Sequence, residues 1–356
     1  MQQTLDDIKM IYSLLSDQQS REVWMNKMLF NETGDFTFWS AVVDRWFSGT
    51  NGILNWIKTL PKDKQIVLYG AGRDGKQVLC FFRNDKRFYG FCSSTEEKQR
   101  DGYLGYPVIS PAELLASKKY SVVIATRSCQ DEIYNFLIGS GYPMDSIYDI
   151  SQLVSYDKSQ YFVDGIIKFE EEEVFVDAGC YDLSTSIEMR SLCPNLKKVY
   201  AFEPDSQNYR RCMNMKAEHK FDCAHIYPYA TWSENAKLTF EEKGNAASKI
   251  GKGDGAIRNT QISAIPIDDV VDPEERVTYI KMDVEGAELE SLKGATKTIT
   301  KYKPKLAICL YHNPEDMFSI PLYINHIVPQ YKLFVRQHMS LSEETVLYAV
   351  LQDELK

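Results

Sequence analysis

The sequence lacks the features that mark membrane, secreted or nucleic-acid-binding proteins. No window holds the roughly 18 apolar residues of a membrane-spanning helix. The opening stretch, MQQTLDDIKMIYSLLSDQQS, has early acids and no unbroken apolar core, so no signal peptide is expected. Lysine and arginine form no long run and the net charge is −9, which argues against nucleic acid or an anionic membrane as the main partner.

Paired cysteines are also lacking. None of the eight cysteines forms a C-x-x-C pair, so neither a zinc ribbon nor a disulfide framework is expected. A reducing cytoplasm is the simplest location for such a chain.

Length and composition indicate a folded protein with two domains. The chain has 356 residues, of which 44% are hydrophobic and 26% are charged, as in ordinary globular proteins with two cores. Strand and helix patterns alternate in two blocks, which predicts two parallel sheets wound with helices. We expect a helical segment at residues 1–60, a small α/β domain at 61–150, a connector at 151–169 and a larger α/β domain at 170–356.

The helical segment is rich in tryptophan. Trp24, Trp39, Trp46 and Trp56 are four of the five tryptophans in the chain. Packing onto a neighbouring domain is the favoured interpretation, because aromatic side chains bury large areas wherever they pack. A homodimer surface is the alternative.

The small α/β domain opens with QIVLYGAGRDG, which places Gly70, Gly72 and Gly75 between a strand and a helix. This is the setting of a dinucleotide-binding turn. The next strand ends in GFCSS, with no acid to hold a ribose, which counts against a nicotinamide-dependent oxidoreductase. The segment resembles the small Rossmann-like domains found beside sugar-modifying enzymes. A phosphate or nucleotide-sugar site at the turn remains open, as does a packing role alone.

In the larger domain, polar groups follow the strands at one edge. Ligands of open α/β sheets bind beyond the carboxyl ends of the strands. Gly179, just after the first strand, lets a ligand approach the backbone. Glu203 ends the second strand, 24 residues later (203 minus 179), which suits a carboxylate that accepts from both ribose hydroxyls. Asp177 can engage a ligand's amino group, and this combination fits S-adenosylmethionine better than a dinucleotide.

Six segments of this domain resemble those of a known family: VFVDAGCYDLSTS, VYAFEPDSQN, IPIDDVV, YIKMDVEGAELESLKGA, KPKLAICLYHNPED and ETVLYA. In this order they resemble the FkbM-type S-adenosylmethionine-dependent methyltransferases over about residues 160 to 352. The block IKMDVEGAE is the most specific. In one respect the sequence departs from the family pattern, because Leu183 stands where the loop after the first strand usually carries a second glycine.

The resemblance implies an α/β fold of two Rossmann-like domains after a short helical segment. The second domain would be a seven-stranded class I methyltransferase sheet whose last strand is antiparallel. The resemblance also implies contacts to S-adenosyl-L-methionine, with Asp283 near the methyl donor. The expected cofactor-binding residues are Asp177, Ala178, Gly179, Cys180, Tyr181, Glu203, Pro204 and Asp283.

Methyl transfer from a sulfonium needs alignment and often a base, but no metal. His312 ends the fifth strand at the ligand edge and is the predicted base, since a histidine titrates near neutral pH; capping the next helix is the alternative. His338 is the second candidate, and Lys281 and Asp283 are expected to orient the acceptor. Glu285 and Glu288 are read as helix-start acids.

The residues after the fourth strand, DVEG, differ from the Asn-Pro-Pro-aromatic signature of many amine and nucleobase methylases. We therefore expect O-methylation of a small-molecule or glycan acceptor, such as a sugar or natural-product hydroxyl. The alternative from another class is a non-catalytic sensor that binds S-adenosylmethionine, a nucleotide or a nucleotide-sugar.

Overall fold

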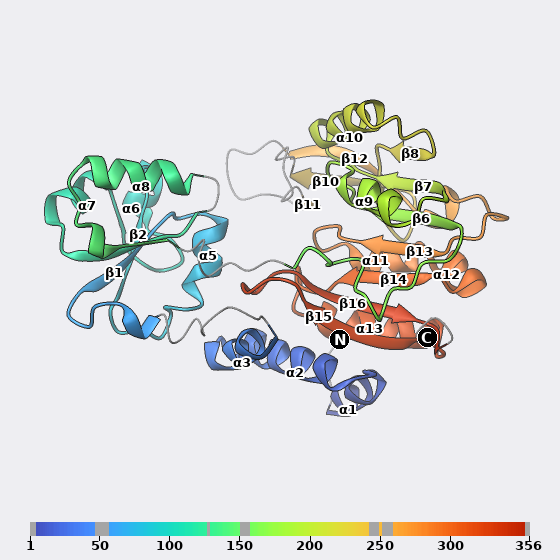
Figure 1. Ribbon diagram of the computed structural model, residues 1–356, viewed down its shortest axis with the longest axis horizontal. Coiled ribbons are helices and arrows are strands. Elements are labelled where there is room, and N and C mark those ends of the chain that lie inside the picture. Colours follow the sequence, from blue (N-terminus) through green and yellow to red (C-terminus); the bar gives the residue numbers. More distant parts are fainter. Residues whose placement is uncertain are drawn as a thin grey trace. The chain divides into compact units, whose positions relative to one another are not determined.

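The computed structural model describes residues 5–46, 57–126, 129–149, 157–241, 249–250 and 259–352. The chain divides into two compact units. The larger unit comprises Met1–Trp24, Lys158–His338 and Glu343–Lys356, and the smaller unit comprises Met25–Asp157 and Met339–Ser342. Both are α/β structures (Figure 1), which confirms the expected fold class.

The smaller unit contains a five-stranded sheet with the order β3-β2-β1-β4-β5. Every neighbouring pair in it is parallel, as the alternation of strand and helix patterns predicts. Its strands are β1 (Gln65–Tyr69), β2 (Phe88–Cys92), β3 (Val108–Ile109), β4 (Tyr120–Ile124) and β5 (Ile147–Asp149). Its connecting helices are α5 (Arg73–Leu79), α6 (Glu96–Asp101), α7 (Pro111–Ser117), α8 (Gln130–Gly139) and the short η1 (Met144–Ser146).

The larger unit is built on a seven-stranded sheet with the order β15-β16-β14-β13-β6-β7-β8. Strand β16 runs antiparallel to both β14 and β15, and the remaining pairs are parallel. The predicted seven-stranded sheet with an antiparallel last strand is therefore confirmed. The strands are β6 (Glu173–Ala178), β7 (Leu196–Phe202), β8 (Ala224–Tyr227), β13 (Tyr279–Met282), β14 (Lys305–Cys309), β15 (Lys332–Gln337) and β16 (Thr345–Val350).

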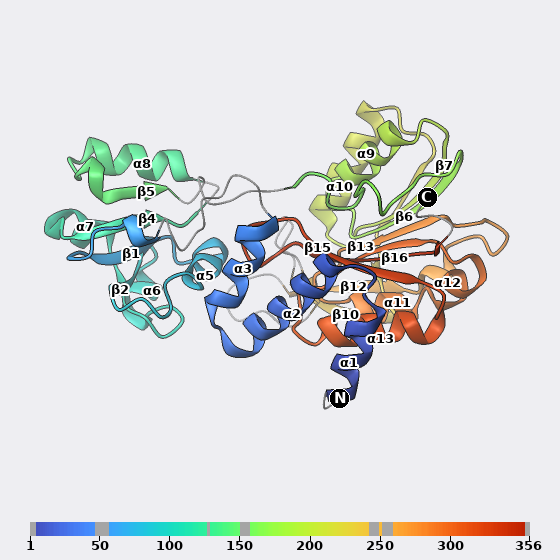
Figure 2. The same cartoon turned by 60° about the horizontal axis from the view of Figure 1, so that its bottom comes forward.

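Helices cover both faces of this sheet. Figure 2 shows two of them, α9 (Ser184–Leu192) and α10 (Ser206–Glu218), on one side of the sheet. The other side carries α11 (Glu288–Lys293), α12 (Thr296–Tyr302) and α13 (Asp316–Ile327). The strands between these layers are buried along most of their length, and β6, β13, β14 and β16 are buried throughout. This explains their continuous apolar runs.

A smaller sheet with the order β11-β10-β12-β9 belongs to the same unit. Its strands are β9 (Ala230–Thr231), β10 (Ala236–Glu241), β11 (Lys249–Ile250) and β12 (Asn259–Ile265), and a short helix, η3 (Ile267–Asp269), follows. The glycine-rich stretch at residues 245–259 is expected from the sequence to be a loop. Most of it lies outside the described residues.

The N-terminal helices α1 (Leu5–Leu14), α2 (Gln18–Thr33) and α3 (Phe36–Trp46) are divided between the two units, with the boundary inside α2. In the larger unit, α1 lies beside α13 (Figures 1 and 2). Trp24 is fully buried and donates to the Met317 carbonyl at 2.7 Å. In the smaller unit, Trp39 is fully buried and donates to the Ser340 carbonyl at 3.1 Å. Both tryptophans therefore pack within the chain, whereas Trp56 lies outside the described residues.

Candidate active site

The strand order of the larger sheet reverses beside β6, which has β7 on one side and β13 on the other. The crossover that follows β6 leads to β7 and the one that follows β13 leads to β14, in opposite directions. At such a point the loops separate, and a ligand crevice is expected at the carboxyl ends of the strands. Gly179, Glu203, Asp283 and His312 follow the ends of β6, β7, β13 and β14. The structure thus brings the predicted site residues to one edge of one sheet.

Gly179 is required by its surroundings. Its φ is +79°, and a Cβ atom added to it would lie 1.8 Å from the carbonyl oxygen of Asp283. No side chain fits this close approach between the ends of β6 and β13.

Leu183, the departure from the family pattern, adopts the conformation that a glycine would. Its φ is +72° and it directly precedes helix α9. The side chain is fully buried in the core of the larger unit. Burial of a leucine stabilises by roughly 1.5–3 kcal/mol, which offsets the roughly 1–2 kcal/mol cost of a left-handed residue. The loop therefore keeps its left-handed turn without the second glycine.

Glu203 directly follows the end of β7 and is 6% exposed. Its Oε2 accepts from the Tyr181 backbone N–H at 3.0 Å, and its Oε1 accepts from the Asp205 N–H at 2.9 Å. Burial raises the pKa of Glu203 to about 7, although these backbone hydrogen bonds act in the opposite direction. The Asn208 side chain also hydrogen-bonds to this carboxylate and lowers its pKa. A carboxylate offers about four acceptor positions, so three bonds leave about one for a further donor.

Asp177 and Lys281 form a buried ion pair behind this loop. The Lys281 Nζ lies 3.1 Å from Asp177 Oδ1 and donates to the Gly179 carbonyl at 2.7 Å. Ser186 donates to the other Asp177 oxygen at 2.7 Å. Burial alone would lower the pKa of Lys281, but the negative charges of Asp177 and Asp283 raise it overall. Both residues are thus engaged in holding the glycine loop, and their predicted direct contacts with ligands stay predictions.

Asp283 is the centre of the second half of the site. Its Oδ2 accepts from the Tyr161 hydroxyl at 2.8 Å, and its Oδ1 accepts from the Tyr311 hydroxyl at 3.3 Å. Burial alone would raise the pKa of Asp283, but the positive charges of Lys281 and His312 lower it overall. The group is therefore a carboxylate at neutral pH, at the end of the strand that packs against the glycine loop.

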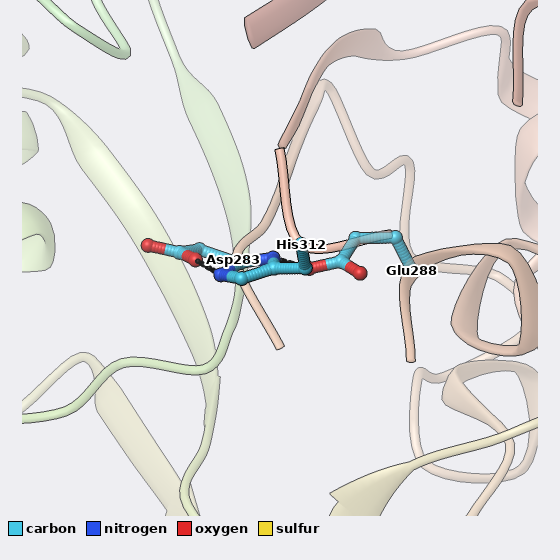
Figure 3. A group of neighbouring side chains, drawn as sticks. All are labelled: Asp283, Glu288 and His312. Atoms are coloured by element: carbon cyan, nitrogen blue, oxygen red, sulfur yellow. Dashed lines mark hydrogen bonds and ion pairs between the residues drawn. The ribbon is translucent and has the colours of Figure 1, made fainter. Parts of the chain in front are cut away.

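The imidazole of His312 lies between two carboxylates (Figure 3). Its Nδ1 is 2.8 Å from Glu288 Oε1, and its Nε2 is 3.6 Å from Asp283 Oδ1 and 3.7 Å from Glu285 Oε2. Burial alone would lower the pKa of His312, but Glu288, Glu285 and Asp283 outweigh burial and hold it well above the ordinary value. The ring is then a cation near neutral pH and must lose a proton before it can act as a base.

Among the described residues, Asp283, Glu288 and His312 form a group whose ligand atoms lie within 4.8 Å of one another, as a metal site would require. The ring separates the two carboxylates, however, and each of its nitrogens faces a different one (Figure 3). This arrangement suits the sharing of protons along a line of three groups better than chelation of one ion.

Glu288 has a role that its sequence position alone did not reveal. It is fully buried, and besides His312 it accepts from the backbone N–H groups of Val284 and Gly286, each at 3.0 Å. The loop between them is strained, since Glu285 has a φ of +55°. Reading Glu285 and Glu288 only as helix-start acids missed these contacts. The sequence did contain a signal for these contacts. Both acids follow the end of β13, and His312 follows the end of the neighbouring strand, β14.

His338, the second candidate base, is 1% exposed. Its Nε2 lies 2.6 Å from the hydroxyl of Tyr348, which in turn donates to the Gln160 carbonyl. The side chain of Gln160 donates to Glu344. His338 is therefore connected to Glu344 only through Tyr348 and Gln160. Two residues of the predicted connector, Gln160 and Tyr161, thus contact acidic residues of the larger unit.

The glycine turn of the smaller unit is tightly closed. A Cβ atom on Gly75 would lie 2.0 Å from the Gly70 carbonyl oxygen, whereas a Cβ atom on Gly72 would have no neighbour within 4 Å. Lys98 donates to the Ala71 carbonyl, and the Tyr103 hydroxyl donates to that of Gly72 at 3.0 Å. The close approach explains the first and third glycines by packing, and ligand binding at this turn stays a prediction.

Comparison with known proteins shows which proteins the larger unit is similar to. Residues 177–340 match the family model described as the methyltransferase FkbM domain. The crystal structure of methyltransferase FkbM from Methylobacillus flagellatus KT is 18% identical, with a TM-score of 0.53, and the alignment covers 91% of this chain and 100% of that one. Similarity at this level of identity shows a shared fold.

Two further solved structures align over about half of the chain. An rRNA methylase from Streptococcus thermophilus is 15% identical, with 51% of this chain and 89% of that one covered and a TM-score of 0.33. Precorrin-6y C5,15-methyltransferase from Geobacter metallireducens GS-15 is 13% identical, with 51% and 82% covered and a TM-score of 0.31. None of the curated proteins compared with the chain matches it. No helix among the described residues is long and apolar enough to cross a membrane.

Proposed function

We propose that this chain, whose residues 177–340 match the model of the methyltransferase FkbM domain, transfers a methyl group from S-adenosylmethionine to an oxygen atom. The acceptor class that we propose is a sugar, glycan or natural-product hydroxyl. The observation that carries the proposal is the reversal of strand order beside β6, where the buried Glu203 follows one neighbouring strand, β7, and the charged carboxylate of Asp283 follows the other, β13.

The Glu203 end of the crevice fits the nucleoside part of S-adenosylmethionine. Two backbone N–H groups and the Asn208 side chain fix the carboxylate, and its remaining acceptor position suits a ribose hydroxyl. Gly179 keeps the loop beside it free of a side chain, since a Cβ there would lie 1.8 Å from the Asp283 carbonyl oxygen. The residues present therefore fit the cofactor.

The Asp283 end fits the reacting groups. S-adenosylmethionine supplies an electrophilic methyl group on a positively charged sulfur. Asp283, with Glu285 and Glu288 nearby, gives this end a surplus of negative charge that favours a cation. The hydroxyls of Tyr161 and Tyr311 hold the Asp283 carboxylate in a fixed orientation, which is the preorganisation that an in-line displacement needs.

His312 serves in this proposal chiefly to hold Asp283. The ring is fixed by Glu288 at Nδ1 and presents its other nitrogen to Asp283 and Glu285. Because these carboxylates keep the ring protonated near neutral pH, it attracts and orients the carboxylates rather than accepting a further proton. Its predicted role as the base would require deprotonation at higher pH.

Binding of S-adenosylhomocysteine, measured by calorimetry and by thermal shift, tests the cofactor assignment. A ligand that binds only the native state must raise the melting temperature. We expect Glu203→Ala to weaken binding about 10- to 100-fold, the effect of losing one charge-assisted hydrogen bond. Glu218→Ala, which removes an exposed glutamate from the end of α10, is the control and should bind as the wild type does.

The acceptor is sought by offering sugars, lipid-linked glycans and polyketide-like alcohols with labelled S-adenosylmethionine. Methyl ethers among the labelled products would support O-methylation, whereas N-methyl products would contradict it. Tight cofactor binding without transfer to any acceptor would favour the sensor instead. Absence of binding to the wild type, or binding that survives Glu203→Ala unchanged, would overturn the cofactor assignment.

A further inference from the structure

Two consecutive residues of the connector fix two carboxyl groups of the larger unit. Gln160 donates from its side chain to Glu344 Oε2, and Tyr161 donates from its hydroxyl to Asp283 Oδ2 at 2.8 Å. The backbone carbonyls of the same pair accept from the buried hydroxyls of Tyr348 and Tyr279. Glu344 and Asp283 are therefore held near one another by a segment that is itself anchored in the core.

The backbone at Glu344 is strained. Its φ is +65°, a left-handed conformation that costs a residue with a Cβ roughly 1–2 kcal/mol. The His338 N–H donates to its carbonyl at 3.0 Å and so keeps the chain in this turn. Strain of this kind persists where the surroundings impose it, and it is concentrated at functional sites. Here it directs the carboxyl group toward Gln160.

Glu344 also differs from its acidic neighbours in what its oxygens contact. Asp283 accepts from two tyrosine hydroxyls, and Glu288 accepts from two backbone N–H groups and faces His312. Within the described part of the chain, Gln160 is the only side chain that hydrogen-bonds to the carboxyl group of Glu344. The residue is half-buried, so this carboxyl group has acceptor capacity left for a ligand.

We propose that Glu344 is the group that takes the proton of the acceptor hydroxyl during methyl transfer. This inference rests on the function proposed above. As the acceptor oxygen forms its bond to the methyl carbon, the carbon–sulfur bond breaks and its electron pair returns to sulfur. The O–H bond of the acceptor breaks and its proton passes to a carboxylate oxygen of Glu344. The products are a methyl ether, a neutral thioether and a protonated Glu344, which then loses its proton to solvent.

The charges around Glu344 suit this role. Burial raises the pKa of Glu344 to about 7, and the negative charges of Asp283 and Glu343 contribute, while the Gln160 hydrogen bond and the His312 cation act in the opposite direction. The other titratable groups that interact with it are Tyr161, Cys309 and Tyr311. A base whose pKa lies near the working pH combines a large reactive fraction with an adequate drive for proton transfer.

A ligand pair tests this placement without a known acceptor. Sinefungin carries an amine-bearing carbon in place of the sulfonium and its methyl, so it puts an ammonium group where the transferred methyl would be. S-adenosylhomocysteine carries no charge at that position. The ratio of the two affinities therefore reports negative charge at the methyl end. The contribution of Glu203 cancels in this ratio, because both ligands share the ribose.

We expect the full-length wild type to prefer sinefungin, and the preference to grow as the pH rises from about 6 to about 8. Glu344→Gln should lower the ratio about tenfold at the higher pH, as one lost charge within about 10 Å would, and should remove its pH dependence. Its affinity for S-adenosylhomocysteine should stay within about threefold of wild type. Glu343→Gln, the matched control, should keep the rise with pH.

An unchanged ratio in a folded Glu344→Gln variant would overturn the proposal. If the wild type binds neither ligand, the cofactor assignment itself fails, which is a different result, and this inference falls with it. Should Glu344→Gln not fold, Gln160→Leu replaces it. Because the Gln160 hydrogen bond lowers the pKa of Glu344, its loss should move the midpoint of the ratio's pH dependence upward, and an unmoved midpoint would contradict the proposal.

Once an acceptor is known, turnover provides a second test. General base catalysis contributes about 10²–10⁴-fold, so Glu344→Gln should lower kcat by about 100-fold or more at neutral pH. The KM for S-adenosylmethionine should change little, and the acidic limb of the pH–kcat profile should disappear. A variant that keeps both the wild-type kcat and this limb would rule out Glu344 as the base.

Discussion

Lowering the pH from about 8 to about 6 should weaken the binding of S-adenosylhomocysteine, because Glu203 becomes protonated over this range. Burial raises the pKa of Glu203 to about 7 in the structure. Ribose hydroxyls that donate to the carboxylate favour its charged form and lower its pKa in the complex. Binding therefore releases a proton near neutral pH, and affinity falls as the pH drops below the pKa of the free protein.

The size of the effect follows from the fraction of Glu203 that is ionised. With a pKa of about 7, that fraction is about nine-tenths at pH 8 and about one-tenth at pH 6. If only the carboxylate form holds the ribose, the affinity changes about tenfold, or about 1.4 kcal/mol. Asp205, which lies beside Glu203 and contributes negative charge, is the neighbour whose removal would reduce the effect.

Calorimetry in buffers of different ionisation enthalpy measures the affinity and the number of protons released in the same experiment. We expect about half a proton to be released per bound ligand near pH 7. Glu203→Gln removes the titrating group and keeps the shape, so its affinity should be lower at pH 8 and nearly constant with pH. A wild type whose affinity is constant from pH 6 to pH 8, with no proton released, would refute the reasoning, and so would a pH dependence that persists in Glu203→Gln.

Three other substitutions test the site. Gly179→Ala should abolish binding of S-adenosylhomocysteine in calorimetry, because the new Cβ would lie 1.8 Å from a backbone oxygen; a variant that binds normally would show that the loop is more adaptable than this. Leu183→Gly relieves a left-handed leucine but empties a buried position, so urea unfolding should show a net loss of about 2–4 kcal/mol, and a gain in stability would contradict this. Glu288→Gln should lower the pKa of His312, followed by NMR titration, because it removes the nearest negative charge; an unchanged pKa would mean that Glu288 does not hold the ring.

The elements that sequence patterns predicted best are those whose physical cause is local. An apolar run that ends in Asp177-Ala178-Gly179 can be read as a buried strand followed by a turn, because the periodicity and the glycine lie within a few residues. Parallel pairing then brings every strand end to the same edge. This is why the sequence alone predicts that Gly179, Glu203, Asp283 and His312 lie at one edge of the sheet.

The contacts that could not be predicted from the sequence join residues that lie far apart in the chain. The bond from Gln160 to Glu344 joins residues 184 positions apart, and that from Tyr161 to Asp283 joins residues 122 positions apart. No local pattern distinguishes these residues, and Glu344 looks like one more acid before a strand. The same holds for Asp177. Its buried ion pair with Lys281 could not be predicted from its position at the end of a strand.

The buried tyrosines connect the core of the larger unit to its chemistry. Tyr279 and Tyr348 lie on β13 and β16 within the apolar core. The hydroxyl of each donates a hydrogen bond to a backbone carbonyl of the connector. A buried hydroxyl without a partner would cost free energy, so these bonds fix where Gln160 and Tyr161 lie. Those two side chains then fix Glu344 and Asp283. Tyr348→Phe should therefore alter the sinefungin preference while leaving binding of S-adenosylhomocysteine nearly unchanged, and a loss of both affinities together would mean that the connector supports the whole crevice rather than its methyl end.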